Sequence, residues 1–329
     1  MRRAAMLACI AMAAVAAPPA GAQDQVAVEI QEWEVPWENS RPRDPYVAPD
    51  GRVWFVGQTA HYAAVLDPRT GEFTRHELPD GAGPHNLIVG EDGIVWYAGN
   101  RAEHIGRLDP ADGRIRRYET TGARDPHTLL WGRNGEIWFT AQGANKIGRF
   151  DPSTGEVRLV DSPLPSSRPY GIVQAPDGAG WVAAFGTNRL LRVDERTMAV
   201  REVVLPREGA RARRLHATSD GRIWYVDYAG GRLGAYDPAG DDLEEWMLPG
   251  GAESRPYAMA VDERDRLWMV ETGPRGQPNT LVGFDPATGT FVSSTDIPSG
   301  GGTVRHMVYH GPTRSIWFGT DVGTIGVAR

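Results

Sequence analysis

Cysteine is almost absent from this sequence. The single cysteine, Cys9, lies in a leading segment that begins with two arginines, continues as an apolar stretch and ends in Ala-Gly-Ala at residues 20–22. This order is typical of a secretory signal peptide with an A-x-A cleavage site. We therefore expect residues 1–22 to be removed on export to the periplasm or the medium. The remaining chain then has neither a thiol nor a disulfide, although an exported protein could keep one.

The sequence also lacks a long apolar run and an excess of positive charge. A bilayer span needs about 20 apolar residues, and the leading apolar stretch is shorter than that. The chain has 35 Lys and Arg against 42 Asp and Glu, a net charge of −7, and two of the arginines belong to the leading segment. Without them 33 basic residues face 42 acidic ones, a net charge of −9. We expect no membrane span and no nucleic-acid partner, because nucleic acids and anionic membranes attract basic proteins.

Long helical periodicity is missing beyond the leading segment, and a tryptophan repeat is present instead. The spacings between successive members are 42, 42, 43, 43, 44 and 49 residues. A period of this size indicates one supersecondary unit that is repeated along the chain. The repeat consists of Trp54, Trp96, Trp138, Trp181, Trp224, Trp268 and Trp317.

Each unit contains four short β-type segments separated by turn residues. In the second unit they are HNLIVG, IVWYAG, HIGRLD and RIRRYE, and Gly, Asp, Asn and Pro separate them. Seven units of four antiparallel strands predict an all-β, seven-bladed β-propeller that forms a single domain over residues 23–329. The last unit lacks a fourth strand. Residues 28–36 resemble the fourth strands of other units, so we expect them to close the ring there.

The residue eleven positions before each tryptophan differs from unit to unit. These residues are predicted to lie at one mouth of the central channel, and each should face the residue fourteen positions further on across a hairpin, at roughly 5 Å. The first set is large and polar, whereas most of its partners are small, which is typical of a concave polar site. The set is Arg43, His85, His127, Tyr170, Arg213, Tyr257 and His306. The partners are Gly57, Gly99, Ala141, Ala184, Asp227, Glu271 and Thr320.

A structural role is the alternative at single positions. Arg213 with Asp227 could form a cross-strand salt bridge, and Tyr257 with Glu271 a hydrogen bond. For the set as a whole we favour a ligand site, because large polar groups are costly to bury without partners. The expected ligand-binding residues are Arg43, Tyr170, Arg213, Tyr257 and Asp227.

The repeat resembles that of the virginiamycin B lyase family over residues 23–329. The segments PHNLIVGEDGIVWY, RPYGIVQAPDG and RPYAMAVDERDRLWMVETG carry the resemblance. It implies a seven-bladed propeller that opens a cyclic depsipeptide by elimination, with a histidine as general base and a Mg²⁺ held with Glu. Carried over to this chain, it implies His306, His127 and His85 as base candidates and Glu271 and Asp125 as metal ligands. Ala141 and Thr320 stand where the family repeat often has Glu.

Three functions follow as hypotheses. The first is a C–O lyase that acts on an ester or cyclic depsipeptide with the help of Mg²⁺. The second is a non-catalytic propeller that binds a ligand or a protein. The third is a lactonase-type hydrolase, although Ca²⁺ prefers several carboxylate and carbonyl oxygens and no position of the first set supplies one. In each case we expect a monomer with a small-molecule or peptide-like ligand at the channel mouth.

Overall fold

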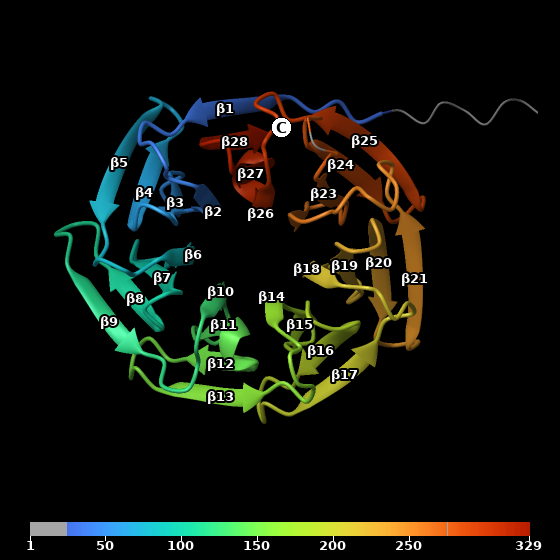
Figure 1. Ribbon diagram of the computed structural model, residues 1–329, viewed down its shortest axis with the longest axis horizontal. Coiled ribbons are helices and arrows are strands. Elements are labelled where there is room, and N and C mark those ends of the chain that lie inside the picture. The colour runs from blue at the N-terminus through green and yellow to red at the C-terminus, as the bar shows by residue number, and fades with distance from the viewer. Residues whose placement is uncertain (1–24, 275) are drawn as a thin grey trace, which may run out of the picture.

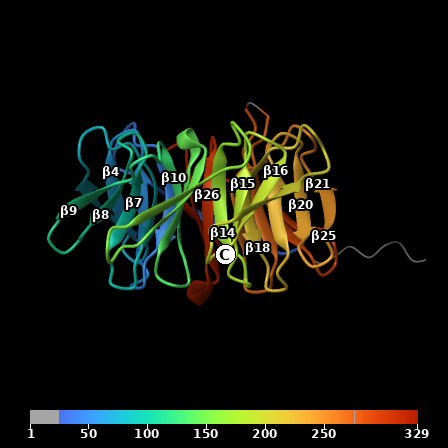
Figure 2. The same cartoon turned by 90° about the horizontal axis from the view of Figure 1, so that it is seen from below.

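The computed structural model describes residues 25–274 and 276–329, and these form the predicted seven-bladed β-propeller. Seven four-stranded antiparallel sheets surround a central axis, with one strand of each sheet nearest to it (Figure 1). Seen from the side, these innermost strands run roughly along the axis of the ring (Figure 2). The predicted signal peptide, residues 1–22, lies outside the described residues. None of the helices in the described part of the chain is long and apolar enough to cross a membrane.

In six blades the strands follow one another outward from the axis. Blade 1 has β2 (Pro42–Val47), β3 (Val53–Gly57), β4 (Tyr62–Asp67) and β5 (Glu72–Glu77). Blade 2 has β6 (Pro84–Val89), β7 (Val95–Gly99), β8 (His104–Leu108) and β9 (Ile115–Glu119). Blade 3 has β10 (Pro126–Trp131), β11 (Ile137–Ala141), β12 (Lys146–Phe150) and β13 (Val157–Asp161), with the 3₁₀ turn η1 (Gln142–Ala144). Blade 4 has β14 (Pro169–Gln174), β15 (Gly180–Ala184), β16 (Arg189–Val193) and β17 (Val200–Val204). Blade 5 has β18 (Ala212–Ala217), β19 (Ile223–Asp227), β20 (Arg232–Asp237) and β21 (Asp242–Met247). Blade 6 has β22 (Met259–Val261), β23 (Leu267–Glu271), β24 (Thr280–Asp285) and β25 (Thr290–Asp296).

Blade 7 is completed by the N-terminal strand, as the sequence predicts. It contains β26 (Val304–His310), η2 (Gly311–Thr313), β27 (Ser315–Thr320), β28 (Thr324–Ala328) and, as its outermost strand, β1 (Ile30–Glu34). β1 runs antiparallel to β28, from the Ile30–Ala328 pair to the Glu34–Thr324 pair. The Trp33 ring stacks on Trp317 with a centroid distance of 5.6 Å. This pairing covers an edge that would otherwise be open to other strands.

The repeated tryptophans form the core between blades. Seven separate apolar clusters join neighbouring blades, and each contains one of the seven tryptophans. Each indole is at most 5% exposed. The stability of the ring therefore depends on seven similar interfaces, and the side chains at the channel are free to differ from blade to blade.

A β-bulge interrupts the innermost strands near the channel mouth. In blade 3, Pro126 pairs with Ala141 and Leu129 pairs with Phe139. The innermost strand β10 therefore advances three residues where its neighbour β11 advances two. Blades 1, 2, 4, 5 and 7 have the same kind of irregularity. A bulge leaves a residue unpaired and re-aims the side chains beside it. In blade 3 those side chains are His127 and Thr128.

Candidate functional site

Seven side chains, one from the start of each blade, gather at one end of the channel. We call them the mouth ring. Five members are buried, with at most 5% exposure, and two are half-buried. Six members are residues predicted from the sequence. The ring consists of Arg43, His85, His127, Tyr170, Arg213, Tyr257 and Arg305.

The predicted pairing across each hairpin is wrong by one residue. In blade 1, Gly57 pairs with Pro42, whereas the Arg43 guanidinium donates to Gln58 Oε1 at 2.8 Å. The bulge adds a residue to the innermost strand, so the predicted partner pairs with the residue before the mouth-ring member, whose side chain reaches one residue further along the neighbouring strand. The same shifted contact joins Tyr170 with Phe185, Arg213 with Tyr228, and Arg305 with Asp321.

The seventh member of the ring is Arg305 rather than His306. Trp138 pairs with Leu130, eight residues earlier, but Trp317 pairs with Val308, nine residues earlier. The turn of blade 7 is therefore one residue longer, so counting eleven residues back from Trp317 stops one residue short, at His306 instead of Arg305. The spacing of 49 residues before Trp317 was the available signal for this insertion. His306 lies one position deeper in the channel.

Aromatic side chains connect four blades within the ring. The ring centroids of His85 and His127 lie 3.5 Å apart, and the centroid of the His127 ring lies 4.1 Å from that of Tyr170. The Tyr170 hydroxyl forms a hydrogen bond with the Tyr257 hydroxyl, which comes from blade 6. The predicted polar residues thus meet one another across the channel.

Arg213 is enclosed by aromatic rings. Its guanidinium carbon lies 3.6 Å from the Tyr257 ring centroid and 4.5–5.1 Å from those of Tyr228, Phe185 and Tyr170. The predicted salt bridge with Asp227 is absent, and among the described residues no carboxylate pairs with Arg213. Cation–π contacts stabilise the charge but leave its N–H groups available to an anionic ligand.

Below the mouth ring, a second ring carries a network of charges across the channel. Its members are Asp44, Asn86, Thr128, Gly171, Arg214, Ala258 and His306. Arg214 Nη2 lies 3.3 Å from Asp44 Oδ2, and Arg214 Nη1 donates to Thr128 Oγ1 at 3.2 Å. Asn86 also donates to Asp44. Burial alone would raise the pKa of Asp44, but Arg43 and Arg214 hold that pKa well below its usual range.

The surroundings separate the pKa values of the two hydrogen-bonded tyrosines. Burial raises the pKa of Tyr170 to about 12. Burial acts in the same direction on Tyr257, but the nearby Arg213 and Arg43 outweigh it and lower the pKa of that phenol. Burial is the largest cause that lowers the pKa values of His85 and His127 well below the usual range of histidine, and the positive charges of nearby arginines lower them further. These imidazoles are therefore neutral at pH 7.

Asp227 has a structural role. It is fully buried, forms an ion pair with Arg207 and accepts hydrogen bonds from the backbone N–H groups of Arg211 and Ala229, at 2.7 and 3.1 Å. These partners hold the start of blade 5 in place. The expectation that Asp227 binds a ligand has no support in this geometry.

The two predicted metal ligands lie in different blades. Glu271, in blade 6, accepts a hydrogen bond from the Gly250 N–H at 2.9 Å instead of facing Tyr257, whose N–H donates to the Val270 carbonyl. Asp125, in blade 3, accepts from Asn100. Burial raises the pKa of both carboxyl groups.

Asp125 also has a backbone role. Its φ of 61° is left-handed, a conformation that Asp tolerates better than most residues. The corresponding residues of other blades share it: Arg41, Gly83, Arg168 and Arg255, at φ values of 45–51°. Residues 25–274 and 276–329 contain no group of three His, Cys, Asp or Glu side chains able to hold a metal ion. The described residues therefore do not fit the implied Mg²⁺ site.

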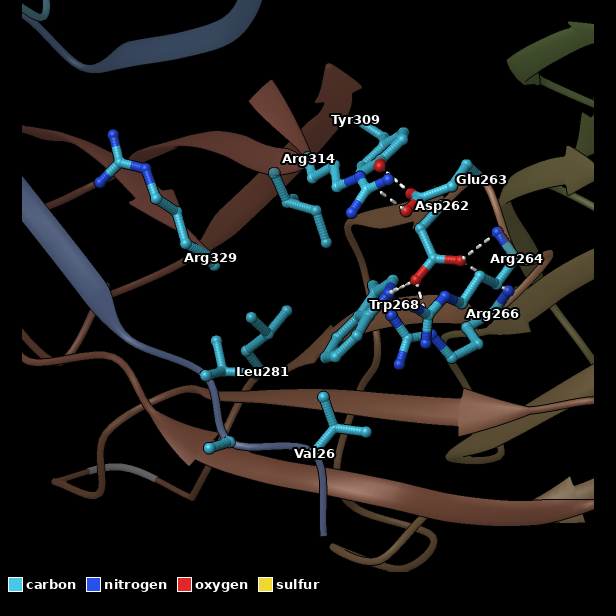
Figure 3. Close-up of a pocket in the computed structure, with 14 residues that line it drawn as sticks. Val26, Asp262, Glu263, Arg264, Arg266, Trp268, Leu281, Tyr309, Arg314 and Arg329 are labelled. Carbon is cyan, nitrogen blue, oxygen red and sulfur yellow. Dashed lines mark hydrogen bonds and ion pairs between the residues drawn. The ribbon is translucent and has the colours of Figure 1, made fainter. Parts of the chain in front are cut away.

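Several cavities lie outside the mouth ring, and two of them adjoin the channel or Val26. One, which we call the exit cavity, occupies the opposite end of the channel with a volume of about 380 Å³, and His306 and Arg214 line it. The other lies between blades 6 and 7 beside Val26 (Figure 3). There Asp262 accepts hydrogen bonds from Arg266 and Trp268, and Glu263 pairs with Arg314. Neither cavity contains a mouth-ring residue.

Residues 28–328 match the profile of the virginiamycin B lyase family. The chain belongs to this family. Among solved structures, a streptogramin B lyase is 24% identical, with a TM-score of 0.82 over 92% of this chain and 97% of that one. A catalytically inactive virginiamycin B lyase from Staphylococcus aureus with quinupristin is also 24% identical, with a TM-score of 0.83 over 92% and 99% of the two chains.

A more distant likeness is to the hydrazine synthase of Kuenenia stuttgartiensis. That chain is 16% identical, with a TM-score of 0.70 over 89% of this chain and 96% of the other. No curated protein matches significantly. At these identities the solved structures establish the fold shared with the virginiamycin B lyase family.

Proposed function

We propose that this protein is a C–O lyase that opens an ester, such as the ring ester of a depsipeptide, by elimination at the mouth ring. The observation that carries the proposal is the hydrogen-bonded pair of Tyr257 and Tyr170, whose pKa values are shifted in opposite directions. Such a separation is the pattern by which active sites assign a base and an acid. Membership in the virginiamycin B lyase family supports the reaction class.

In this mechanism Tyr257, as a phenolate, takes a proton from the carbon next to a substrate carbonyl. The electron pair of that C–H bond forms a C=C bond, and the neighbouring C–O bond breaks with its electrons on the leaving carboxylate. Water is not consumed. Tyr170 stays protonated and donates its hydrogen bond to the phenolate. A base with a pKa near the working pH is the most effective, and Tyr257 is the mouth-ring phenol whose pKa is lowered.

Arginines would stabilise the negative charge that develops on oxygen. The guanidinium carbons of Arg213 and Arg305 lie 3.6 and 5.6 Å from the Tyr257 ring centroid. Guanidinium groups bind carboxylates strongly, and fixed charges at a developing oxyanion lower the barrier. Arg213 is the better candidate, since Arg305 already pairs with Asp321. His127 would position Tyr170, against which its ring packs.

Replacing Tyr257 by phenylalanine tests the proposed base. We expect wild-type protein to open a cyclic depsipeptide such as quinupristin without a change of mass, and Tyr257→Phe to slow this about 100-fold, as loss of a general base does. The matched control is Tyr118→Phe, which removes a hydroxyl from the outermost strand β9. Mass spectrometry separates elimination from hydrolysis, because a lactonase product is heavier by one water. Full activity in Tyr257→Phe would contradict the assignment.

The same experiment in EDTA tests the Mg²⁺ that the family resemblance implies. We expect opening to continue, because Arg213 and Arg305 already supply positive charge beside Tyr257. Loss of opening in EDTA, restored by added Mg²⁺, would show that the metal is required.

The rate should depend on pH through Tyr257. The phenolate is the active form, so kcat/KM should rise with pH and level off above a midpoint lower than the ordinary tyrosine value of about 10. Arg213→Ala removes a cation that lowers this pKa, so the midpoint should move to higher pH. An unchanged midpoint in Arg213→Ala would show that another group titrates.

A second candidate function is binding of a carboxylate ligand without chemistry. It is favoured by the burial of Tyr257, which is 1% exposed beneath Arg213. In that case no compound of a depsipeptide and lactone panel would be opened, while Arg213→Ala would still abolish saturable binding of one of them.

A further inference from the structure

We propose that the exit cavity is a second ligand site, which binds a small neutral molecule with an apolar body and one hydroxyl group. The cavity opens at the end of the channel opposite the mouth ring, and its volume of about 380 Å³ is within the range of small-molecule pockets. The site is therefore independent of the proposed elimination chemistry.

The walls of the cavity are mostly apolar. Half-buried side chains from the innermost strands of four blades surround it: Tyr46, Leu130, Val173, Val308 and Tyr309. Fully buried neighbours such as Leu129 and Met307 extend the same surface. Apolar side chains that remain partly exposed within a concave surface gain free energy when an apolar ligand covers them. The body of the ligand is thus assigned to hydrocarbon or aromatic chemistry.

The charged group at the floor of the cavity is already neutralised. Arg214 pairs with Asp44, donates to Thr128 Oγ1, and donates through Nε to the Arg305 carbonyl at 3.1 Å. Its three nitrogens therefore each have a partner, which leaves little for an anionic ligand. A cation would find no carboxylate among the residues that line the cavity.

His306 supplies the polar contact. Its imidazole lines the cavity, Nδ1 is enclosed by protein, and Nε2 has no hydrogen-bond partner among the described residues. Burial lowers the pKa of His306 to about 3 and that of the neighbouring His216 to about 4, so both rings are neutral at pH 7. A neutral imidazole exchanges a hydrogen bond with a hydroxyl group without burying a charge.

Titration calorimetry at pH 7 with 2-naphthol and its anionic counterpart 2-naphthoate tests the site. We expect saturable one-to-one binding of 2-naphthol and binding of 2-naphthoate at least ten times weaker. Val308→Trp should abolish 2-naphthol binding, because the indole fills the cavity. The matched control is Val204→Trp, the same substitution at a residue on β17 that is 55% exposed, and it should bind as the wild type does.

His306→Ala is the second variant, because a tryptophan at position 308 can disturb packing. We expect it to weaken 2-naphthol binding roughly fivefold, the effect of losing one neutral hydrogen bond, while circular dichroism shows an intact fold. Three results would overturn the proposal: no saturable binding of 2-naphthol, undiminished binding in a folded Val308→Trp, or binding of 2-naphthoate as tight as that of 2-naphthol. Unchanged affinity in His306→Ala would remove His306 from the site.

Discussion

Replacing Asp44 by asparagine is expected to lower the free energy of unfolding by about 3–5 kcal/mol, the effect of removing one partner from a buried ion pair. Asp44 is 1% exposed, and its carboxylate oxygens lie 3.4 Å from Arg43 Nε and 3.3 Å from Arg214 Nη2. The asparagine keeps the shape of the side chain but leaves two buried guanidinium groups without their carboxylate. Urea denaturation at pH 7 measures the loss.

Asp50→Asn is the matched control. Asp50 pairs with Arg52 at the surface, where its side chain is 47% exposed, and exposed pairs contribute at most about 1 kcal/mol. A loss in Asp44→Asn no larger than in Asp50→Asn would contradict the structural role of the second ring.

The difference between wild type and Asp44→Asn should depend on pH. The folded-state pKa of Asp44 is depressed by Arg43 and Arg214, so the carboxylate stabilises the fold fully above its unfolded pKa of about 3.9. As pH falls below about 4 towards the folded-state pKa, this stabilisation is lost. The two proteins should therefore differ most near pH 7 and converge in acid.

Deleting residues 25–35 is expected to lower the melting temperature by about 10 °C or more. The deletion removes β1, exposes the edge of β28 and leaves Trp317 without the Trp33 ring that covers it. A loss of about 5 kcal/mol corresponds to a shift of this size in a chain of this length. Differential scanning calorimetry measures the shift.

Trp33→Ala is the milder form of the same test, and Trp246→Ala is its matched control. Trp246, on the outermost strand of blade 5, stacks on Trp224 at 5.4 Å, much as Trp33 stacks on Trp317 at 5.6 Å. Only Trp33 also belongs to the strand that closes the ring. Trp33→Ala should therefore be the more destabilising, and equal effects would show that closure contributes little.

The fold could be predicted because its signals are local and repeated. Each tryptophan marks a hairpin, and the Asp that follows caps a turn through its own side chain, as Asp151 does by accepting from the Ser153 N–H at 2.8 Å. The closing strand was predictable from its likeness to other outer strands. Such features depend on residues close in sequence, which a single chain reveals.

The site was predictable only in part. Six of the seven mouth-ring residues were identified, because the tryptophan spacing fixes how far each innermost strand extends. In six blades a bulge moved the predicted partner by one residue, and the longer turn of blade 7 exchanged His306 for Arg305. The Arg214–Asp44 pair joins residues 170 positions apart. No local sequence pattern predicts such a contact across the channel. The direction of the Tyr257 pKa shift depends on that three-dimensional arrangement too.

The pairing of β1 with β28 also fixes when the propeller can be finished during protein synthesis. The ribosome produces β1 before every other described strand and β28 after them. The early blades can fold as they emerge, since each is made of consecutive strands. The closing strand has no partner during that time and has to wait until β28 has been made. A nascent chain stalled before β28 would therefore keep blade 7 incomplete, and only a chain that already includes β28 can hide this strand edge from chaperones and proteases.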